Sequence, residues 1–486
     1  MLKGFSRTVL RNSAFAFAAQ ISLKILSFAF TIFIVRRLGN EAFGQYAGIG
    51  AFSSVFLFVS DLGLSVLAVR EVARWRDVPD GADKINALYG NMLALRLLLA
   101  ALTGLITITV AWLTNRPLLF IGAVALNGLG ILMYGAQGTS NAFLGGFERI
   151  GRSSRAQVMN QVAFMGLGGL ALWFGLGYYG LIIAALVGIV ILTYTCWVGV
   201  RDLGVRPLKP NFAEWPALIK ASIPFGIVTF ALGLSYKFDT VLLSVTRSNA
   251  EVAWYNVAYN LIFSCAMLSN VVNTALYPSL SRQSVAGAHA LPAIYERTLR
   301  YLMVLAIPLA LGIFILSPDL IPLLFKAENR NAAPALQVLI WVVPFMYASE
   351  FLGYVVLIAG QEKKVARSVV ISTLFNVAVN LIVVPRYGYM AAAVMTVLTE
   401  AILVGQYVFI LRAQLSGFQW GYVLVRPLLA ALGMGLVLWV TRDLPLWIHA
   451  PLGALTYAAF VVLLGVLGKD ELSFVRNLRR PEIQAS

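Results

Sequence analysis

The chain has 486 residues, of which 60% are apolar and 12% are charged, and its mean hydropathy is +0.82. A soluble core cannot use that much apolar surface, so the composition excludes a soluble enzyme and predicts a polytopic membrane protein with about 14 spans. Two cysteines and two histidines are too few for a disulfide framework or a zinc cluster, so we expect no metal and no cofactor.

Apolar segments long enough to cross a membrane follow one another along nearly the whole chain. The first runs past the length of a signal peptide and ends in Arg36-Arg37 without a cleavage pattern, so it reads as a span. In chain order the predicted spans are 12–35, 42–69, 86–113, 117–146, 154–175, 178–200, 217–246, 251–281, 298–326, 333–360, 365–385, 389–411, 422–442 and 446–468.

The net charge of +16 is distributed unevenly over the loops. Of the 37 Lys and Arg residues, 26 fall on the side that holds the N-terminus, 8 on the opposite side, and three within spans. Such an excess on alternate loops follows the positive-inside rule. It predicts a multi-pass protein of the cell membrane with both termini cytoplasmic, and it explains the basic charge without a nucleic-acid partner.

The two halves of the sequence repeat. Glu41–Tyr46 resembles Glu251–Tyr255, with the tyrosines 209 residues apart, and the YGxxxAA pattern at Tyr179 recurs at Tyr387. Matches in the same order at nearly constant offset predict two parallel six-helix repeats, forming two lobes around a central cavity, plus two extra C-terminal helices. The expected lobes are 1–210 and 211–414, and 415–486 holds the extra spans and a cytoplasmic tail.

The repeated segments resemble polysaccharide-biosynthesis flippases of the Wzx (O-antigen) type, in the multidrug/oligosaccharidyl-lipid/polysaccharide exporter superfamily. The resemblance is carried by Arg36–Tyr46, Ser60–Leu64, Val69–Glu71, Phe238–Leu243, Tyr255–Tyr259, Asn376–Asn380 and Pro385–Gly388. It implies transport, for cell-surface polysaccharide biosynthesis, of an oligosaccharide on a polyprenyl phosphate or pyrophosphate from the cytoplasmic to the outer leaflet. The implied partners are this lipid-linked substrate and membrane lipids.

Neither an enzyme nor an ATP-driven pump fits the loops. Every outward loop is short, which leaves no room for a catalytic domain, and no GxxxxGK[ST] motif occurs. Work against a gradient would then come from ions, with protons or sodium as candidates. Two alternatives stay open within the same superfamily: an ion-coupled multidrug exporter and a lipid II-type flippase.

Ionisable side chains inside spans are the first candidates for function. Each would cost roughly 2.5 to 3.5 kcal/mol facing lipid at mid-membrane, so they are expected to face protein or water. There are seven: Lys24, Asp61, Arg96, Lys237, Asp239, Glu350 and Glu400. The four acids read either as ion-coupling groups or as members of structural ion pairs, and Asp61 is the first choice for coupling.

A polar stripe on the first span is the clearest positional signal. Gln20, Lys24, Ser27 and Thr31 lie within about 60° of one another at 100° per residue. A lysine on such a stripe predicts a water-filled cavity in which the ammonium binds a phosphate oxygen. The alternative is that Lys24 pairs with an acid such as Asp61. A central lysine also disfavours a multidrug exporter, which would bind cations.

Further substrate-binding candidates lie on other spans. Arg96 and Lys237 are possible cavity cations, although Lys237 and Asp239 lie about 200° apart around their helix and cannot face one narrow cavity. Asp239 is also a candidate partner of Lys24. A second stripe, suited to sugar hydroxyls or to helix packing, contains Asn256, Asn260 and Asn270. The pair Asn376 and Asn380 favours a structural role between helices.

Overall fold

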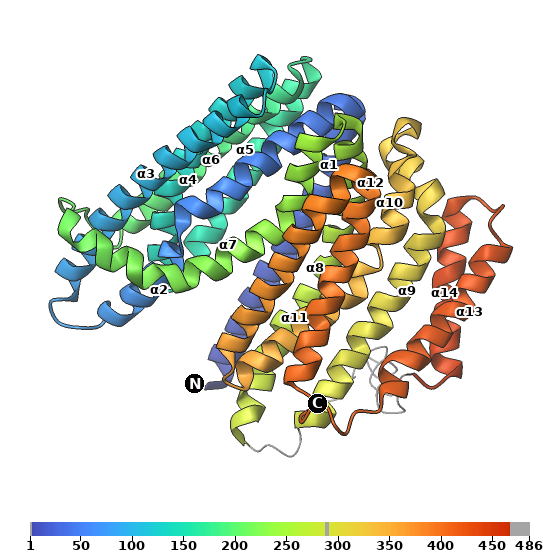
Figure 1. The fold of residues 1–486 in the computed structure, drawn as a ribbon. Coiled ribbons are helices and arrows are strands. Elements are labelled where there is room, and N and C mark those ends of the chain that lie inside the picture. The colour runs from blue at the N-terminus through green and yellow to red at the C-terminus, as the bar shows by residue number, and fades with distance from the viewer. Residues whose placement is uncertain (1, 287–290, 467–486) are drawn as a thin grey trace. The chain divides into compact units, whose positions relative to one another are not determined.

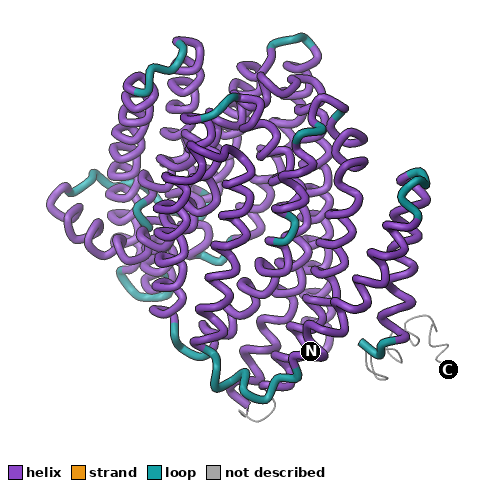
Figure 2. The backbone as a smooth tube through the Cα atoms, turned by 45° about the vertical axis from the view of Figure 1, so that its right-hand side comes forward, coloured by secondary structure: helices purple, strands orange, loops and turns teal. Residues whose placement is uncertain are grey.

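The computed structural model describes residues 2–286 and 291–466, with side chains except at 2–21, 58–59, 267–268, 270–286 and 291. Within this part the chain is helical throughout and contains no β-strand, as Figure 2 shows. The predicted all-α class is confirmed. In a bilayer core only helices or closed barrels satisfy every backbone hydrogen bond, and the long apolar runs select the helix.

Most helices match one predicted span each (Figure 1). Their bounds are α1 (Leu2–Asp61), α2 (Leu64–Trp75), α3 (Gly81–Leu113), α4 (Leu118–Gly146), α5 (Ile150–Trp173), α6 (Gly177–Arg201), α7 (Trp215–Thr246), α8 (Asn249–Ala286), α9 (Leu291–Phe325), α10 (Ala332–Leu339), α11 (Val342–Ile358), α12 (Glu362–Ile410), α13 (Arg426–Val440) and α14 (Leu446–Leu463).

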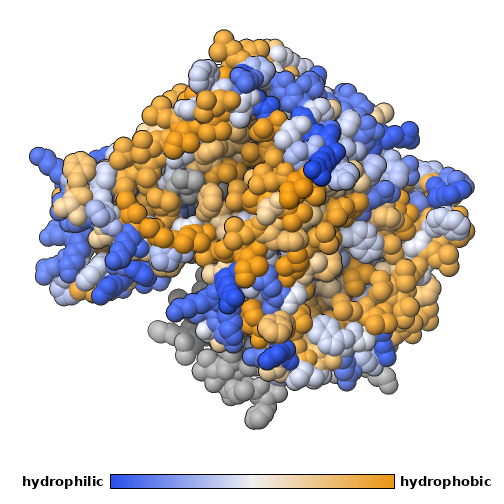
Figure 3. Space-filling view, viewed as in Figure 1, coloured by the Kyte–Doolittle hydropathy of each residue, from blue (hydrophilic) through white to orange (hydrophobic). Residues whose placement is uncertain are grey.

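Nine helices in the described part of the chain are long and apolar enough to cross a membrane. Figure 3 shows apolar side chains over much of the visible face of the helices, where a soluble protein would be polar. The protein is therefore a polytopic membrane protein. Each of the fourteen predicted spans lies on helix through most of its length, and their number as separate crossings stays a prediction.

The structure corrects the predicted boundaries at three glycines. The expected loop after span 12–35 is a kink at Gly39 (φ 74°) inside α1, and the one before span 389–411 is a kink at Gly388 (φ 66°) inside α12. The predicted span 42–69 is instead interrupted after Asp61, because Leu62 and Gly63 take positive φ values of 44° and 79°. Left-handed residues cannot continue a right-handed helix.

The chain divides into two compact units, residues 1–257 with 369–392 and residues 258–368 with 393–486. In the first unit α3, α4, α5 and α6 lie side by side, and α7 packs against α1 and α2. In the second unit α13 packs against α9 and α14, so the C-terminal pair belongs to that unit. This division differs from the expected lobes at 1–210 and 211–414, whose boundaries stay a prediction.

Candidate functional site: buried charges at the membrane helices

The break between α1 and α2 is built around Asp61. Its carboxylate accepts hydrogen bonds from the Gly63 amide (3.2 Å) and from the Ser65 hydroxyl (2.6 Å). These contacts satisfy groups at the start of α2, and a negative charge is favoured at a helix N-terminus. Asp61 therefore stabilises the broken conformation directly.

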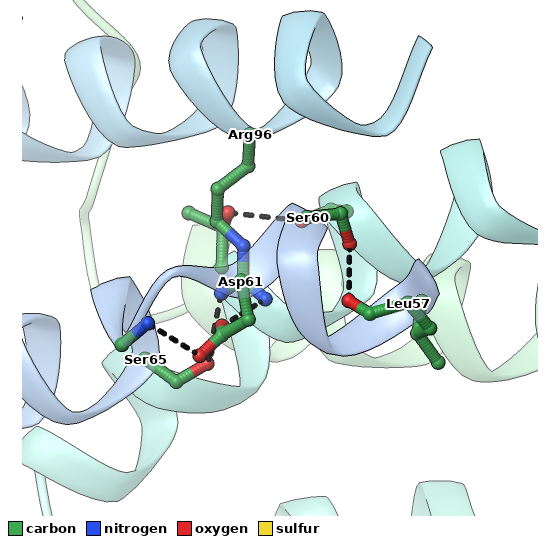
Figure 4. Close-up of polar contacts among 8 residues, drawn as sticks. Leu57, Ser60, Asp61, Ser65 and Arg96 are labelled. Carbon is green, nitrogen blue, oxygen red and sulfur yellow. Dashed lines mark hydrogen bonds and ion pairs between the residues drawn. The ribbon is translucent and has the colours of Figure 1, made fainter. Parts of the chain in front are cut away.

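Arg96 reaches this carboxylate from α3 (Figure 4). Its Nη2 lies 2.6 Å from Asp61 Oδ1, and its Nη1 donates to the Ser65 hydroxyl at 2.9 Å. The Arg96 side chain is 6% exposed and that of Asp61 16%. The guanidinium lies against Gly138 of α4, where a Cβ would overlap it. Arg96 is thus the counter-charge of Asp61, in place of Lys24, and the pair is charge-assisted and mostly buried.

The break also contacts the backbone of α7. A Cβ at Gly226 would lie 2.5 Å from the Leu62 carbonyl oxygen, and a Cβ at Gly63 would overlap the Gly226 amide. Pro224 sits inside α7 beside this contact and removes one backbone donor there. Only two glycines permit the two backbones to approach this closely.

Lys24 is exposed, and it makes no hydrogen bond or ion pair with any side chain that the structure describes. Beside it, Ser27 donates to the Leu23 carbonyl (2.8 Å) and accepts from Gln161 Nε2 of α5 (3.0 Å). Thr31 donates to the Ser27 carbonyl (3.0 Å). Ser27 and Thr31 therefore donate their hydroxyl protons to backbone carbonyls of α1, whereas the Lys24 ammonium remains available to another partner. The side chain of Gln20 lies outside the described residues.

Sequence reasoning missed Gln161, which places a carboxamide beside the Lys24 stripe. The available signal was its position on a predicted span as a polar residue, one turn from Gln157. Gln157 in turn donates to the Ser153 hydroxyl (3.3 Å). The polar groups of α5 thus continue the polar stripe of α1 within the first unit.

Asp239 is 3% exposed and lies among neutral donors. The Tyr255 hydroxyl donates to it at 2.9 Å and Asn380 Nδ2 at 2.8 Å. The side-chain carbonyl oxygen of Asn380, Oδ1, is buried and accepts no hydrogen bond within the described structure. Lys237, half-buried on the same helix, makes no described polar contact with Asp239, as the expected 200° separation requires.

The predicted asparagine stripe on α8 is described in part. Asn256 Nδ2 donates to the Val252 carbonyl (2.8 Å), and its Oδ1 accepts from Thr240 of α7 (3.4 Å). Asn260 is half-buried, and its backbone carbonyl accepts from Ser264 (2.9 Å). The side chain of Asn270 lies outside the described residues. Asn256 accordingly links α7 to α8.

In the second unit the structure brings Glu350 and Glu400 into electrostatic range of each other, from α11 and α12. Glu350 accepts a hydrogen bond from Ser269 of α8 (2.7 Å). Glu400 Oε2 is buried without a donor among the described residues. Within the described residues no three His, Cys, Asp or Glu side chains gather as a metal site requires.

Comparison with known families decides the classification. Residues 9–284, more than half of the chain, match the family described as "Polysaccharide biosynthesis protein". The chain belongs to this family. Residues 224–382 also match the MatE family, in agreement with the predicted superfamily. The resemblance inferred from the sequence motifs is confirmed.

One curated relative and two solved structures resemble the chain. The chain is 23% identical over 397 residues to the "Probable low-salt glycan biosynthesis flippase Agl15" of Haloferax volcanii, covering 81% of each chain. It is similar to the structure "Lipid II flippase MurJ, inward closed conformation", with a TM-score of 0.74, 15% identity, and coverage of 95% of this chain and 100% of that one. An inward-facing MATE multidrug resistance transporter gives a TM-score of 0.63 at 14% identity, over 82% and 94% of the chains.

Proposed function

We propose that this protein is a flippase that moves a lipid-linked oligosaccharide from the cytoplasmic to the outer leaflet of the cell membrane. The observation that carries the proposal is the match of residues 9–284 to the polysaccharide biosynthesis family. The glycan flippase among its relatives and the fold shared with a lipid II flippase support the same substrate class. The charge distribution supports cytoplasmic termini.

The substrate sets the mechanism. A pyrophosphate and several sugars cannot lose their hydration in hydrocarbon at tolerable cost, so the polar head needs a protein-lined path while the polyprenyl tail stays in lipid. Two parallel repeats can supply that path by alternating access, with the repeat of residues 1–210 rocking against that of residues 211–414.

Lys24 is the residue to which we assign the phosphate of the carrier. Its ammonium is exposed on a polar stripe and has no partner in the described structure. Arg96, by contrast, is paired with Asp61, so we do not assign it to the substrate-binding group. Lys237 is half-buried without a described counter-charge, and it is the second cation of the proposed path.

Asp239 is the group to which we assign ion coupling. It carries a carboxylate with two neutral donors, and the acceptor Oδ1 of Asn380 lies on the same amide as one of those donors. A buried carboxylate is costly in its charged form and can take up a proton or a metal ion, and its oxygen atoms suit sodium. We expect a proton or sodium ion to bind here during the cycle.

The test is flipping in reconstituted vesicles. Fluorescent polyprenyl-pyrophosphate glycan is placed in one leaflet, and its appearance in the other is followed by a membrane-impermeant quencher, with and without imposed proton and sodium gradients. We expect protein-dependent flipping. Vesicles in which the labelled lipid crosses no faster than in protein-free controls would contradict the assignment.

The match of residues 224–382 to the MatE family favours a second candidate, an exporter of amphiphilic cations. The same vesicles distinguish the candidates when ethidium replaces the lipid. We expect no ethidium transport, because an exposed lysine in the path repels a cation. Lipid II in a third preparation tests whether the protein accepts a peptide-bearing carrier.

A further inference from the structure

The turn between α7 and α8 is held by two sets of contacts. The turn is short, since α7 ends at Thr246 and α8 begins at Asn249. One set ties it to α12, in its own repeat, and the other ties it to α1 and to the loop between α3 and α4, in the first repeat. All of these residues lie within the first compact unit.

The contacts with α12 are hydrogen bonds to its backbone near the kink at Gly388. Glu251 Oε2 accepts from the Tyr389 amide (3.2 Å) and lies against Gly388, where a Cβ would overlap it. Arg247 Nη1 lies 3.9 Å from Glu251 Oε1, and Arg247 Nε donates to the Val384 carbonyl (3.4 Å). Two backbone hydrogen bonds and the Gly388 contact therefore join the turn to the α12 kink, and the Arg247–Glu251 ion pair lies within the turn segment itself.

The contacts with the first repeat involve small residues and single hydrogen bonds. Asn249 Nδ2 donates to Glu41 Oε1, and the Asn249 carbonyl lies against Gly44, where a Cβ would overlap it. A Cβ at Gly48 would lie 3.0 Å from Ser244 Cβ. We name the group the latch; it consists of Glu41, Gly44, Gly48, Arg116, Ser244 and Asn249, with Arg116 Nη2 donating to the Ser244 carbonyl.

The two glutamates of the repeated motif therefore behave differently. Glu251 stays within its own repeat, whereas Glu41 reaches across to the other. When Tyr46 is aligned with Tyr255, Gly44 corresponds to Ala253 and Glu41 to Ala250, one residue before Glu251. The glycine is therefore present only on the side where the backbones touch.

We propose that the latch seals the outward end of the transport path. It is closed when the first repeat contacts the α7–α8 turn, and it opens when the two lobes separate. The turn leaves with α12, and the contacts broken are those of Glu41, Gly44, Gly48 and Arg116. The inference rests on the proposed function for its transport readout and on the proposed topology for the side it faces.

A reversible cross-link tests the latch in a background where the two native cysteines, Cys196 and Cys265, are replaced by alanine. Gly48→Cys with Ser244→Cys places the two Cβ atoms close to the 3.5 to 4.5 Å that a disulfide requires. We expect the disulfide to form in most of the population, flipping to fall at least about 10-fold, and a thiol reductant to restore it. Unchanged flipping by fully cross-linked protein would overturn the seal.

A second measurement needs no substrate. Ser244 is 3% exposed, so Ser244→Cys reports opening through its rate of labelling by a membrane-impermeant maleimide added outside cells. Gly44→Ala should speed labelling about 10-fold, since its methyl overlaps the Asn249 carbonyl, whereas Gly50→Ala on the same helix has open space and should not. Equal labelling rates in Gly44→Ala and Gly50→Ala would contradict the proposed latch. If wild-type protein flips no glycan lipid, the proposed function fails while this labelling result still stands or falls by itself.

Discussion

Two buried aspartates in the first compact unit are accommodated in opposite ways. Asp61 sits at a helix break and forms an ion pair with Arg96 at 2.6 Å, whereas Asp239 lies inside α7 and accepts hydrogen bonds from Tyr255 and Asn380. From the sequence both were candidates for coupling or for structural pairing, with Asp61 the first choice for coupling. A carboxylate with a fixed cation has little reason to bind a mobile one, so we propose Asp239, rather than Asp61, as the coupling group.

The largest effect should come from breaking the fixed pair. Arg96→Ala leaves the Asp61 carboxylate buried without its cation, and removing one partner of a buried pair costs roughly 3 to 5 kcal/mol. The free energy of unfolding in mixed detergent micelles measures this. Arg155→Ala, an exposed arginine on α5, is the control. Adding Asp61→Asn to Arg96→Ala should recover part of the loss, and an Arg96→Ala protein as stable as the control would show the pair to be unimportant.

A smaller effect is expected at Lys24, the cation that neither aspartate uses. A charge-assisted hydrogen bond is worth roughly 1.5 to 3 kcal/mol, so Lys24→Ala should weaken substrate binding by about 10 to 150 fold. Because the side chain is exposed, the unfolding free energy should change by less than about 0.5 kcal/mol. Titration with labelled lipid-linked glycan gives the affinity, with Lys24→Arg as the charge-conserving control. Wild-type affinity in Lys24→Ala would remove the phosphate contact.

At Asp239 a modest change in stability should accompany a specific change in function. Asp239→Asn keeps the shape and an acceptor for Tyr255 but removes the charge, so we expect less than about 1.5 kcal/mol of destabilisation. Flipping should lose its response to an imposed proton or sodium gradient. Asp61→Asn is the matched variant and should retain that response. The comparison is reversed if the gradient dependence disappears in Asp61→Asn and survives in Asp239→Asn.

The apolar spans and the fold class could be predicted from the sequence because a lipid bilayer constrains each crossing segment separately. A segment that crosses hydrocarbon must satisfy its own backbone as a helix, so about 20 apolar residues in a row are enough to predict one. The family followed from local motifs such as Arg36–Tyr46, and the helical period placed Lys24 and Asp239 on particular faces.

What only the tertiary structure decided was which faces meet and at what depth. Nothing local to Asp61 names Arg96 as its partner, because that pairing depends on the register of α3 against α1. The interruption of span 42–69 at Leu62 and Gly63 likewise depends on the close approach of Gly226 from α7. A periodic pattern gives the direction of a side chain around its own axis, whereas contacts also require the rotation, tilt and vertical offset of a second helix, which packing between helices sets.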